Sequence, residues 1–438
     1  MNDYEIKLKQ SLFCILEDMG KHTHDFVYNP GKDCTRNRKL GFVDFMHFTL
    51  SMGAKSTNNE LLRYFDYSMD APSPSAYNQQ RAKIKPEAFH FWFDTFTKTL
   101  SQDKTYLGYK LIACDGSDIN ITRGKKGDAT LIQSGSKRAY SLMHVSAFYD
   151  LLNGFYLDAI VHAKKETDEK GECVTMIDRS RFEKILLICD RGYENYNLFA
   201  HAQEKGWKYL IRAKDINTKN GIVYGCHLGL SGEFDTTKDI ILTRNDRKRP
   251  PEQRGVYKSL NASSRRFDYL PPDDLEREYP MRLRIVRIKI SENNYETLIT
   301  NLSPIEISME GLKELYHMRW GIETSFREIK YYVGMLNLHA KKPDYVSQEI
   351  YANLIIYNFC KAVTNRITVP EKPAQKYQYR LNMSAAVSIC RQFLFERYAV
   401  LSELEMLIRK YLTPIRLNRS FPRKVVDKKP VSLNYRPA

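Results

Sequence analysis

The chain has 438 residues, of which 42% are hydrophobic and 27% charged, a balance typical of a folded protein with room for two or three domains. Its formal net charge of +16 favours nucleic acid as a partner over an anionic membrane surface, with simple solubility charge as the alternative explanation. The eight cysteines are scattered and form no C-x-x-C pair, which excludes a zinc finger. Together with the lack of an apolar signal segment and of any apolar run of about 18 residues, they predict a reducing, cytoplasmic location.

Residues 1–104 are predicted to be helical and to form a DNA-binding region. A turn rich in Pro and Ser precedes a helix expected over 76–84. The polar face of that helix carries Asn78, Gln79 and Arg81, whose side chains are suited to base edges and phosphates in a DNA groove. The alternative for these three residues is an ordinary solvated surface.

The part of the chain from 105 to 345 is predicted to be a catalytic domain of the α/β class. Strands are expected at 111–114, 142–149, 154–161, 185–189 and 207–212. Short turns join the first three strands into an antiparallel meander, whereas predicted helices alternate with the last two. Three antiparallel strands followed by alternating helices and strands suit an RNase H-like core.

Two further regions complete the predicted organisation. Residues 215–305 contain basic and Pro-rich stretches with strand-like segments, and we expect them to form a β-rich insertion in the catalytic domain. Residues 346–438 are predicted to form a helical C-terminal region that ends in a basic tail.

Two aspartates directly follow apolar runs of the predicted core. Asp115 comes after Leu-Ile-Ala-Cys, and Asp190 comes after Ile-Leu-Leu-Ile-Cys. Two carboxylates that meet at one edge of a sheet repel each other unless divalent cations neutralise them, and oxygen ligands suit Mg²⁺ or Mn²⁺. For either residue alone, capping of the next turn is the alternative role, and Gly116 and Gly192 would serve such a turn equally well.

A long helix is expected to start near Ser308 and to run past Lys330. At about 100° per residue, one side of this helix collects a polar row of Tyr316, Arg319, Glu323 and Lys330. An apolar stripe lies beside the row and consists of Leu315, Ile322, Phe326, Ile329 and Val333. Cationic side chains around a single glutamate make sense if the cations bind phosphates and the glutamate holds a metal ion. Trp320 is assigned to the core rather than to base stacking.

The polar row resembles the Y-R-E-K motif of the IS4 family of DDE transposases, here Tyr316-x2-Arg319-x3-Glu323-x6-Lys330. The segments that begin at Asp115 and Asp190 resemble the two aspartate motifs of that family, and the β-rich insertion is similar too. The resemblance covers roughly 110–335, with Ser117 where the family commonly has threonine. Asp118 is the alternative first ligand, but Asp115 is favoured because it directly follows the apolar run.

The resemblance implies that three acidic residues are catalytic and hold two divalent ions, Mg²⁺ or Mn²⁺: Asp115, Asp190 and Glu323. It implies that DNA phosphates contact Tyr316, Arg319 and Lys330. Such an enzyme cuts the inverted repeats of an insertion sequence and joins them to target DNA by cut-and-paste through a hairpin, as a homodimer in the prokaryotic cytoplasm near the nucleoid. The alternatives are an RNase H-like DNA nuclease without strand transfer and a catalytically idle DNA-binding protein. The presence of all three acidic residues argues against the idle protein.

Overall fold

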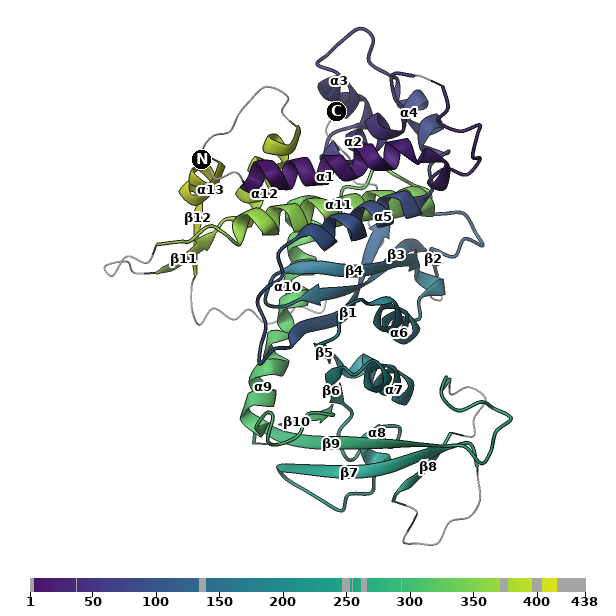
Figure 1. The fold of residues 1–438 in the computed structure, drawn as a ribbon, viewed down its shortest axis with the longest axis vertical. Helices are drawn as coiled ribbons and strands as arrows, with labels where there is room; N and C mark the ends of the chain where they lie inside the picture. The colour runs from purple at the N-terminus through teal and green to yellow at the C-terminus, as the bar shows by residue number, and fades with distance from the viewer. Residues whose placement is uncertain are drawn as a thin grey trace.

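The computed structural model describes residues 4–36, 38–133, 139–245, 253, 255–260, 266–292, 294–370, 377–395 and 404–415 (Figure 1). The basic tail and most of the Arg-, Lys- and Pro-rich stretch of the insertion lie outside these residues. None of the helices in the described part combines the length and the apolar character that a membrane crossing requires.

A mixed sheet forms the centre of the molecule. Its strands from the first half of the chain are β1 (Lys110–Ile121), β2 (Leu131–Ile132), β3 (Tyr140–Asp150), β4 (Phe155–Ala163), β5 (Ile185–Cys189) and β6 (Lys208–Ala213). The order β4-β3-β1 is antiparallel, and β5 and then β6 continue beside β1 in parallel orientation. This arrangement confirms the predicted α/β class with its antiparallel meander and RNase H-like core.

The insertion extends this sheet instead of forming a separate one. Its elements are α8 (Ile222–Gly225), β7 (Phe234–Thr243), β8 (Tyr257–Ser259), β9 (Glu278–Ser291) and β10 (Asn294–Thr300). Strand β10 pairs antiparallel with β6, and β9, β7 and β8 follow outward. Arg287, which is 6% exposed, anchors the insertion through an ion pair of 2.7 Å with Asp215 after β6. The insertion is therefore β-rich, as predicted.

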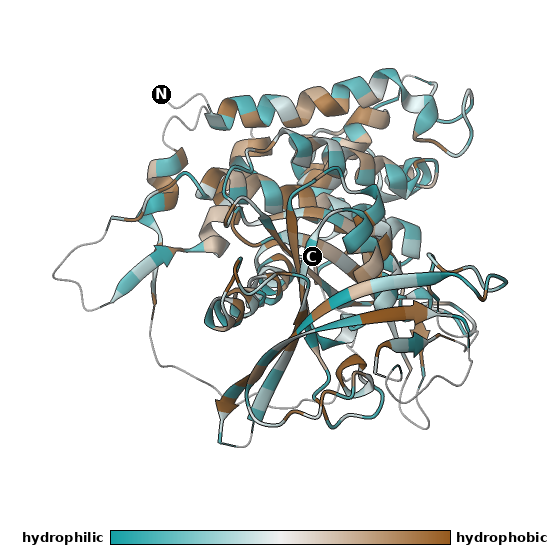
Figure 2. Ribbon diagram, turned by 60° about the horizontal axis from the view of Figure 1, so that its bottom comes forward, coloured by the Kyte–Doolittle hydropathy of each residue, from teal (hydrophilic) through white to brown (hydrophobic). Residues whose placement is uncertain are grey.

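Helices from both ends of the chain pack together above the sheet (Figure 1). They are α1 (Tyr4–Lys21), α2 (Phe42–Ser51), α3 (Thr57–Tyr64), α4 (Pro74–Arg81), α5 (Pro86–Thr99), α11 (Pro343–Thr364), α12 (Met383–Phe395) and α13 (Leu404–Lys410), with a two-stranded antiparallel sheet of β11 (Gln378–Leu381) and β12 (Leu412–Ile415). Helix α5 lies along α11, and one hydrophobic core runs from these helices into the sheet. Figure 2 shows the hydrophobic central strands beneath helices of mixed hydropathy.

Helices α6 (Glu169–Arg179) and α7 (Tyr196–Glu204) lie on one side of the core sheet, and α9 (Met309–Met318) and α10 (Trp320–Glu328) run along the other (Figure 1). The predicted long helix begins after Ser308, whose hydroxyl accepts a hydrogen bond from the Gly311 amide. It is interrupted at Arg319 and ends in a π-helical turn, Ile329–Val333. The predicted apolar stripe of this helix is buried.

Candidate active site

The register of the parallel strands sets the two aspartates side by side. Cys114 of β1 pairs with Cys189 at the end of β5, so Asp115 and Asp190 are the next residues on neighbouring strands. Asp190 follows the strand end, as predicted. Asp115 instead lies in the middle of β1, which continues to Ile121 because β3 still pairs with it. The two carboxylates nevertheless share one edge, since β5 ends beside Asp115.

Asp118 lies on the other face of β1, because side chains alternate along a strand. Its Oδ1 lies 2.7 Å from Nδ1 of His144 and 2.9 Å from Nζ of Lys164. His144 is 2% exposed and also lies 3.3 Å from Glu169 at the start of α6. Asp118 therefore belongs to an ionic cluster on the α6 side of the sheet.

Helices α9 and α10 bring the polar row to the opposite face. The hydroxyl of Tyr316 donates a hydrogen bond of 3.1 Å to Oδ1 of Asp190. The guanidinium of Arg319 donates to Oε1 of Glu323 at 2.9 Å and lies 3.6 Å from Oδ2 of Asp115. Arg319 is 3% exposed, so its charge faces the carboxylates of Glu323 and Asp115 and not the solvent.

Lys330 completes the row from the π-helical turn. Its Nζ donates to Oγ of Ser117 at 2.7 Å and to the carbonyl of Asp118 at 2.8 Å. A π-helical turn shifts the side chains that follow it relative to a regular helix. Lys330 belongs to this turn, and its ammonium group contacts β1 at Ser117, two residues after Asp115.

The electrostatics of the site are those of crowded carboxylates. Burial raises the pKa of Asp115 to about 6, and Glu323 and Asp190 add to the rise while the Gly116 amide and Arg319 oppose it. Among the described residues, no three acidic, histidine or cysteine side chains lie close enough together to hold one ion as they are placed. Arg319 donates a hydrogen bond to Glu323 and forms an ion pair with Asp115, so it places positive charge beside two of the three carboxylates. The oxygen-only donors and the raised pKa fit a divalent metal.

Two further charged residues border the site and were missed in the sequence. Arg212, near the end of β6, lies 3.9 Å from Asp190 and 3.3 Å from Glu296 of β10. Burial raises the pKa of Glu296, and Asp190 contributes to the rise. The sequence around Glu296 does not indicate that it borders the site, because only the pairing of β6 with β10 brings it near Asp190. The assignment of Trp320 to the core is wrong, since it is 44% exposed where α10 begins.

The three residues predicted to contact DNA lie on α4, but they do not share one exposed face of it. Asn78 and Gln79 are exposed, and their role stays a prediction. Arg81 is 1% exposed, and its guanidinium bonds Gln348 at 2.9 Å and Glu349 at 2.8 Å on α11. The expectation that Arg81 contacts DNA is therefore corrected: its position on α4 turns it inward, where it joins the N- and C-terminal helices.

Residues 106–359 match the family model described as the transposase DDE domain. The chain belongs to this family. The transposase is accordingly a DNA-acting enzyme of the metal-dependent polynucleotidyl transferase class, and its matched region contains both aspartates and the polar row. No curated protein matches the chain.

Among solved structures, the transposase is similar to the piggyBac transposase in a cryo-EM structure of its synaptic complex with hairpin DNA. The two chains share 12% sequence identity with a TM-score of 0.46, and the match covers 92% of this chain and 84% of that one.

Proposed function

We propose that Asp115, Asp190 and Glu323 are the catalytic carboxylates and that they hold two divalent ions, Mg²⁺ or Mn²⁺. The single observation that carries this proposal is the guanidinium of Arg319, which bonds Glu323 and lies beside Asp115. Two half-buried carboxylates thus meet one positive charge, and Asp190 follows on the strand next to Asp115. Held by these residues, the ions would supply Lewis acidity for the attacking and leaving oxygens of an in-line phosphoryl transfer.

Tyr316, Arg319 and Lys330 are proposed to hold DNA phosphates at the cleavage point. Nε of Arg319 is buried and has no acceptor among the described residues, so a phosphate oxygen would satisfy it. Burial raises the pKa of the Tyr316 phenol, and Asp190 adds to this, so the hydroxyl remains a donor at neutral pH. Tyr316, Arg319 and Lys330 would thus orient the strand as donors, while the carboxylates remain for the metal ions.

The reaction proposed for this site is cut-and-paste transposition of an IS4-like insertion sequence through a hairpin intermediate. Its support is the Y-R-E-K spacing on one helix face, together with the β-rich insertion between Asp190 and Glu323. We propose terminal inverted repeats and target DNA as substrates, and a homodimer as the active form, because two element ends must be held together.

The test is nicking of a labelled duplex that carries the terminal repeat of the element, in Mg²⁺, with a parallel binding titration. Asp190→Ala and Glu323→Ala should reduce nicking to background and leave DNA binding nearly unchanged. Asp118→Asn is the matched control, because Asp118 lies on the other face of β1 and should still support nicking. The metal assignment is wrong for any carboxylate whose alanine variant cuts at the wild-type rate.

The same experiment separates the alternatives. Release of nicked products that are never hairpinned or joined to a target plasmid would indicate a nuclease. Tight binding without any cleavage by the wild-type protein, in Mg²⁺ and in Mn²⁺, would indicate an idle DNA-binding protein.

A further inference from the structure

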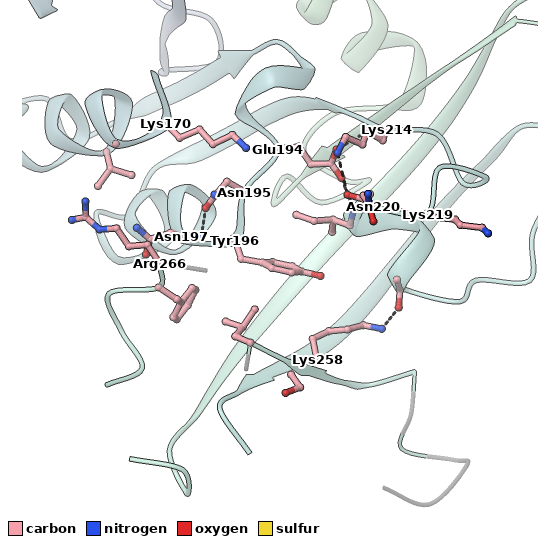
Figure 3. Close-up of a pocket in the computed structure, with 18 of the residues that line it drawn as sticks. Lys170, Glu194, Asn195, Tyr196, Asn197, Lys214, Lys219, Asn220, Lys258 and Arg266 are labelled. Carbon is pink, nitrogen blue, oxygen red and sulfur yellow. Dashed lines mark hydrogen bonds between the residues drawn. The ribbon is translucent and has the colours of Figure 1, made fainter. Parts of the chain in front are cut away.

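A cavity of about 680 Å³ lies between the core and the insertion, away from the polar row (Figure 3). Its wall is formed by the N-terminal ends of α6 and α7, the segment after β6, and strand β8. Two of its lining residues are Glu194, which follows Asp190 closely in the chain, and Lys214, which directly follows the end of β6. The cavity therefore adjoins the edge of the sheet where Asp190 lies, but it is on the α6–α7 side.

The lining of the cavity is rich in cations, namely Lys170, Lys214, Lys219, Lys258 and Arg266. Its acidic residues are Asp168 and Glu194. Both carboxylate oxygens of Glu194 accept backbone amides, from Lys214 at 2.9 Å and from Ile222 at 2.5 Å, so Glu194 fastens the loop after β6. Positive charge in the cavity consequently exceeds negative charge.

Within the described part of the chain, no carboxylate neutralises the lysines of the cavity. None of the four forms an ion pair with any residue that the structure describes, whereas Arg266 pairs with Asp268 at 2.9 Å. Lys258 bonds the Gly225 carbonyl, and burial lowers its pKa. Lysine ammonium groups gathered in one cavity repel each other, and an anion relieves this repulsion.

Backbone dipoles add to the positive potential. Helices α6 and α7 both begin at the cavity, at Asp168–Lys170 and Asn195–Tyr196, and the N-terminus of a helix attracts anions. Figure 3 shows the ring of Tyr196 in the middle of the cavity, with Lys170, Lys214 and Lys258 around it. Cations around an aromatic face are the combination that binds the phosphates and bases of a nucleic-acid strand.

We propose that this cavity binds the phosphate groups of one unpaired DNA strand on the α6–α7 side of the sheet. This inference rests on the proposed function. The volume is in the range that accommodates a ligand of nucleotide size. A strand held here lies on the face of the sheet opposite the row of Tyr316, Arg319 and Lys330, so the cavity is a second DNA contact, separate from the phosphate contacts at the cleavage point.

The test uses the full chain and a fluorescent oligothymidylate of about 20 nucleotides, with anisotropy recorded over a salt series. Lys170→Gln/Lys214→Gln should lower the affinity by about tenfold. It should also reduce the salt slope by about 1.4, because each lost phosphate contact on a single strand contributes about 0.7. Lys98→Gln/Lys205→Gln carries the same loss of charge outside the cavity and should bind like the wild type. Lys170→Gln alone, whose side chain makes no hydrogen bond in the described structure, repeats the test if the double variant unfolds.

Two outcomes would overturn the proposal. The first is equal loss of oligonucleotide affinity in the cavity and control variants. The second is wild-type oligonucleotide binding by the cavity variant together with lost binding of a labelled nucleoside triphosphate, which would make the cavity a site for a free nucleotide. Failure of the proposed catalytic function is distinguishable, because Asp190→Ala should leave oligothymidylate binding intact whether or not the protein cuts DNA.

Discussion

The hydroxyl of Tyr316 donates a hydrogen bond of 3.1 Å to Oδ1 of Asp190 and so ties helix α9 to the end of β5. This bond fixes the orientation of a carboxylate that is proposed to hold metal. Hydrogen bonds made to a metal ligand, and not to the metal itself, affect metal affinity strongly.

Tyr316→Phe removes this bond and leaves the ring in place. We expect the concentration of Mg²⁺ that gives half-maximal nicking to rise by about tenfold, because Asp190 loses its fixed orientation. The measurement is a Mg²⁺ titration of nicking, with the unfolding free energy as a control for folding. A Phe variant with an unchanged Mg²⁺ requirement would show that the bond has no part in metal binding.

Arg319→Ala removes the guanidinium from the carboxylate group and from the proposed phosphate. We expect cleavage to fall by about 10- to 150-fold, equivalent to about 1.5–3 kcal/mol for a charge-assisted bond, with little change in overall DNA affinity. Arg327→Ala is the control, since Arg327 lies on the same helix and is exposed. Single-turnover nicking and a binding titration provide the comparison, and equal losses in both variants would contradict the assignment.

The raised pKa of Asp115 predicts how stability depends on pH in the absence of metal. The folded protein holds this proton up to about pH 6, whereas an unfolded aspartic acid releases it near pH 4. The folded state therefore loses stability as pH rises through this interval, by up to about 3 kcal/mol. Asp115→Asn should be more stable than wild type above pH 6, and the difference should vanish toward pH 4. Urea unfolding of both proteins in EDTA measures it; a constant difference across the series would disagree with burial as the cause.

Arg81→Ala should reduce stability, not sequence preference. Burial raises the pKa of Glu349, but Arg81 and His339 outweigh this effect and hold it at about 2. Removal of Arg81 leaves Glu349 charged and buried, at an expected cost of about 3–5 kcal/mol in unfolding free energy. Gln79→Ala, on the exposed side of the same helix, should change it by less than about 0.5 kcal/mol. Thermal or urea unfolding decides, and an Arg81→Ala protein of normal stability would refute the structural role.

Asn78 and Gln79 remain the predicted contacts to DNA bases on α4. The double variant Asn78→Ala/Gln79→Ala should lose about 1–3 kcal/mol of affinity for the terminal repeat, while affinity for unrelated DNA stays the same. Asn58→Ala on α3 serves as the exposed control. If the double variant keeps its full preference for the repeat in a competition assay, recognition lies elsewhere in the protein.

The sequence by itself determined the α/β class, the succession of core strands and helices along the chain, and the helix face that carries Tyr316, Arg319, Glu323 and Lys330. These features depend on local periodicity, which the residues of each segment impose on their own. The three candidate carboxylates were also predictable, because each one stands in a recognisable local pattern.

Only the tertiary structure decided what those side chains contact. Asp115 lies on the face of β1 that meets α10, whereas Asp118 lies on the opposite face. The pairing of β10 with β6 brings Glu296 near Asp190. The direction of Arg81 depends on α11, more than 260 residues later in the chain. Contacts between distant segments follow from which faces bury apolar surface together, and no window of local sequence contains that information.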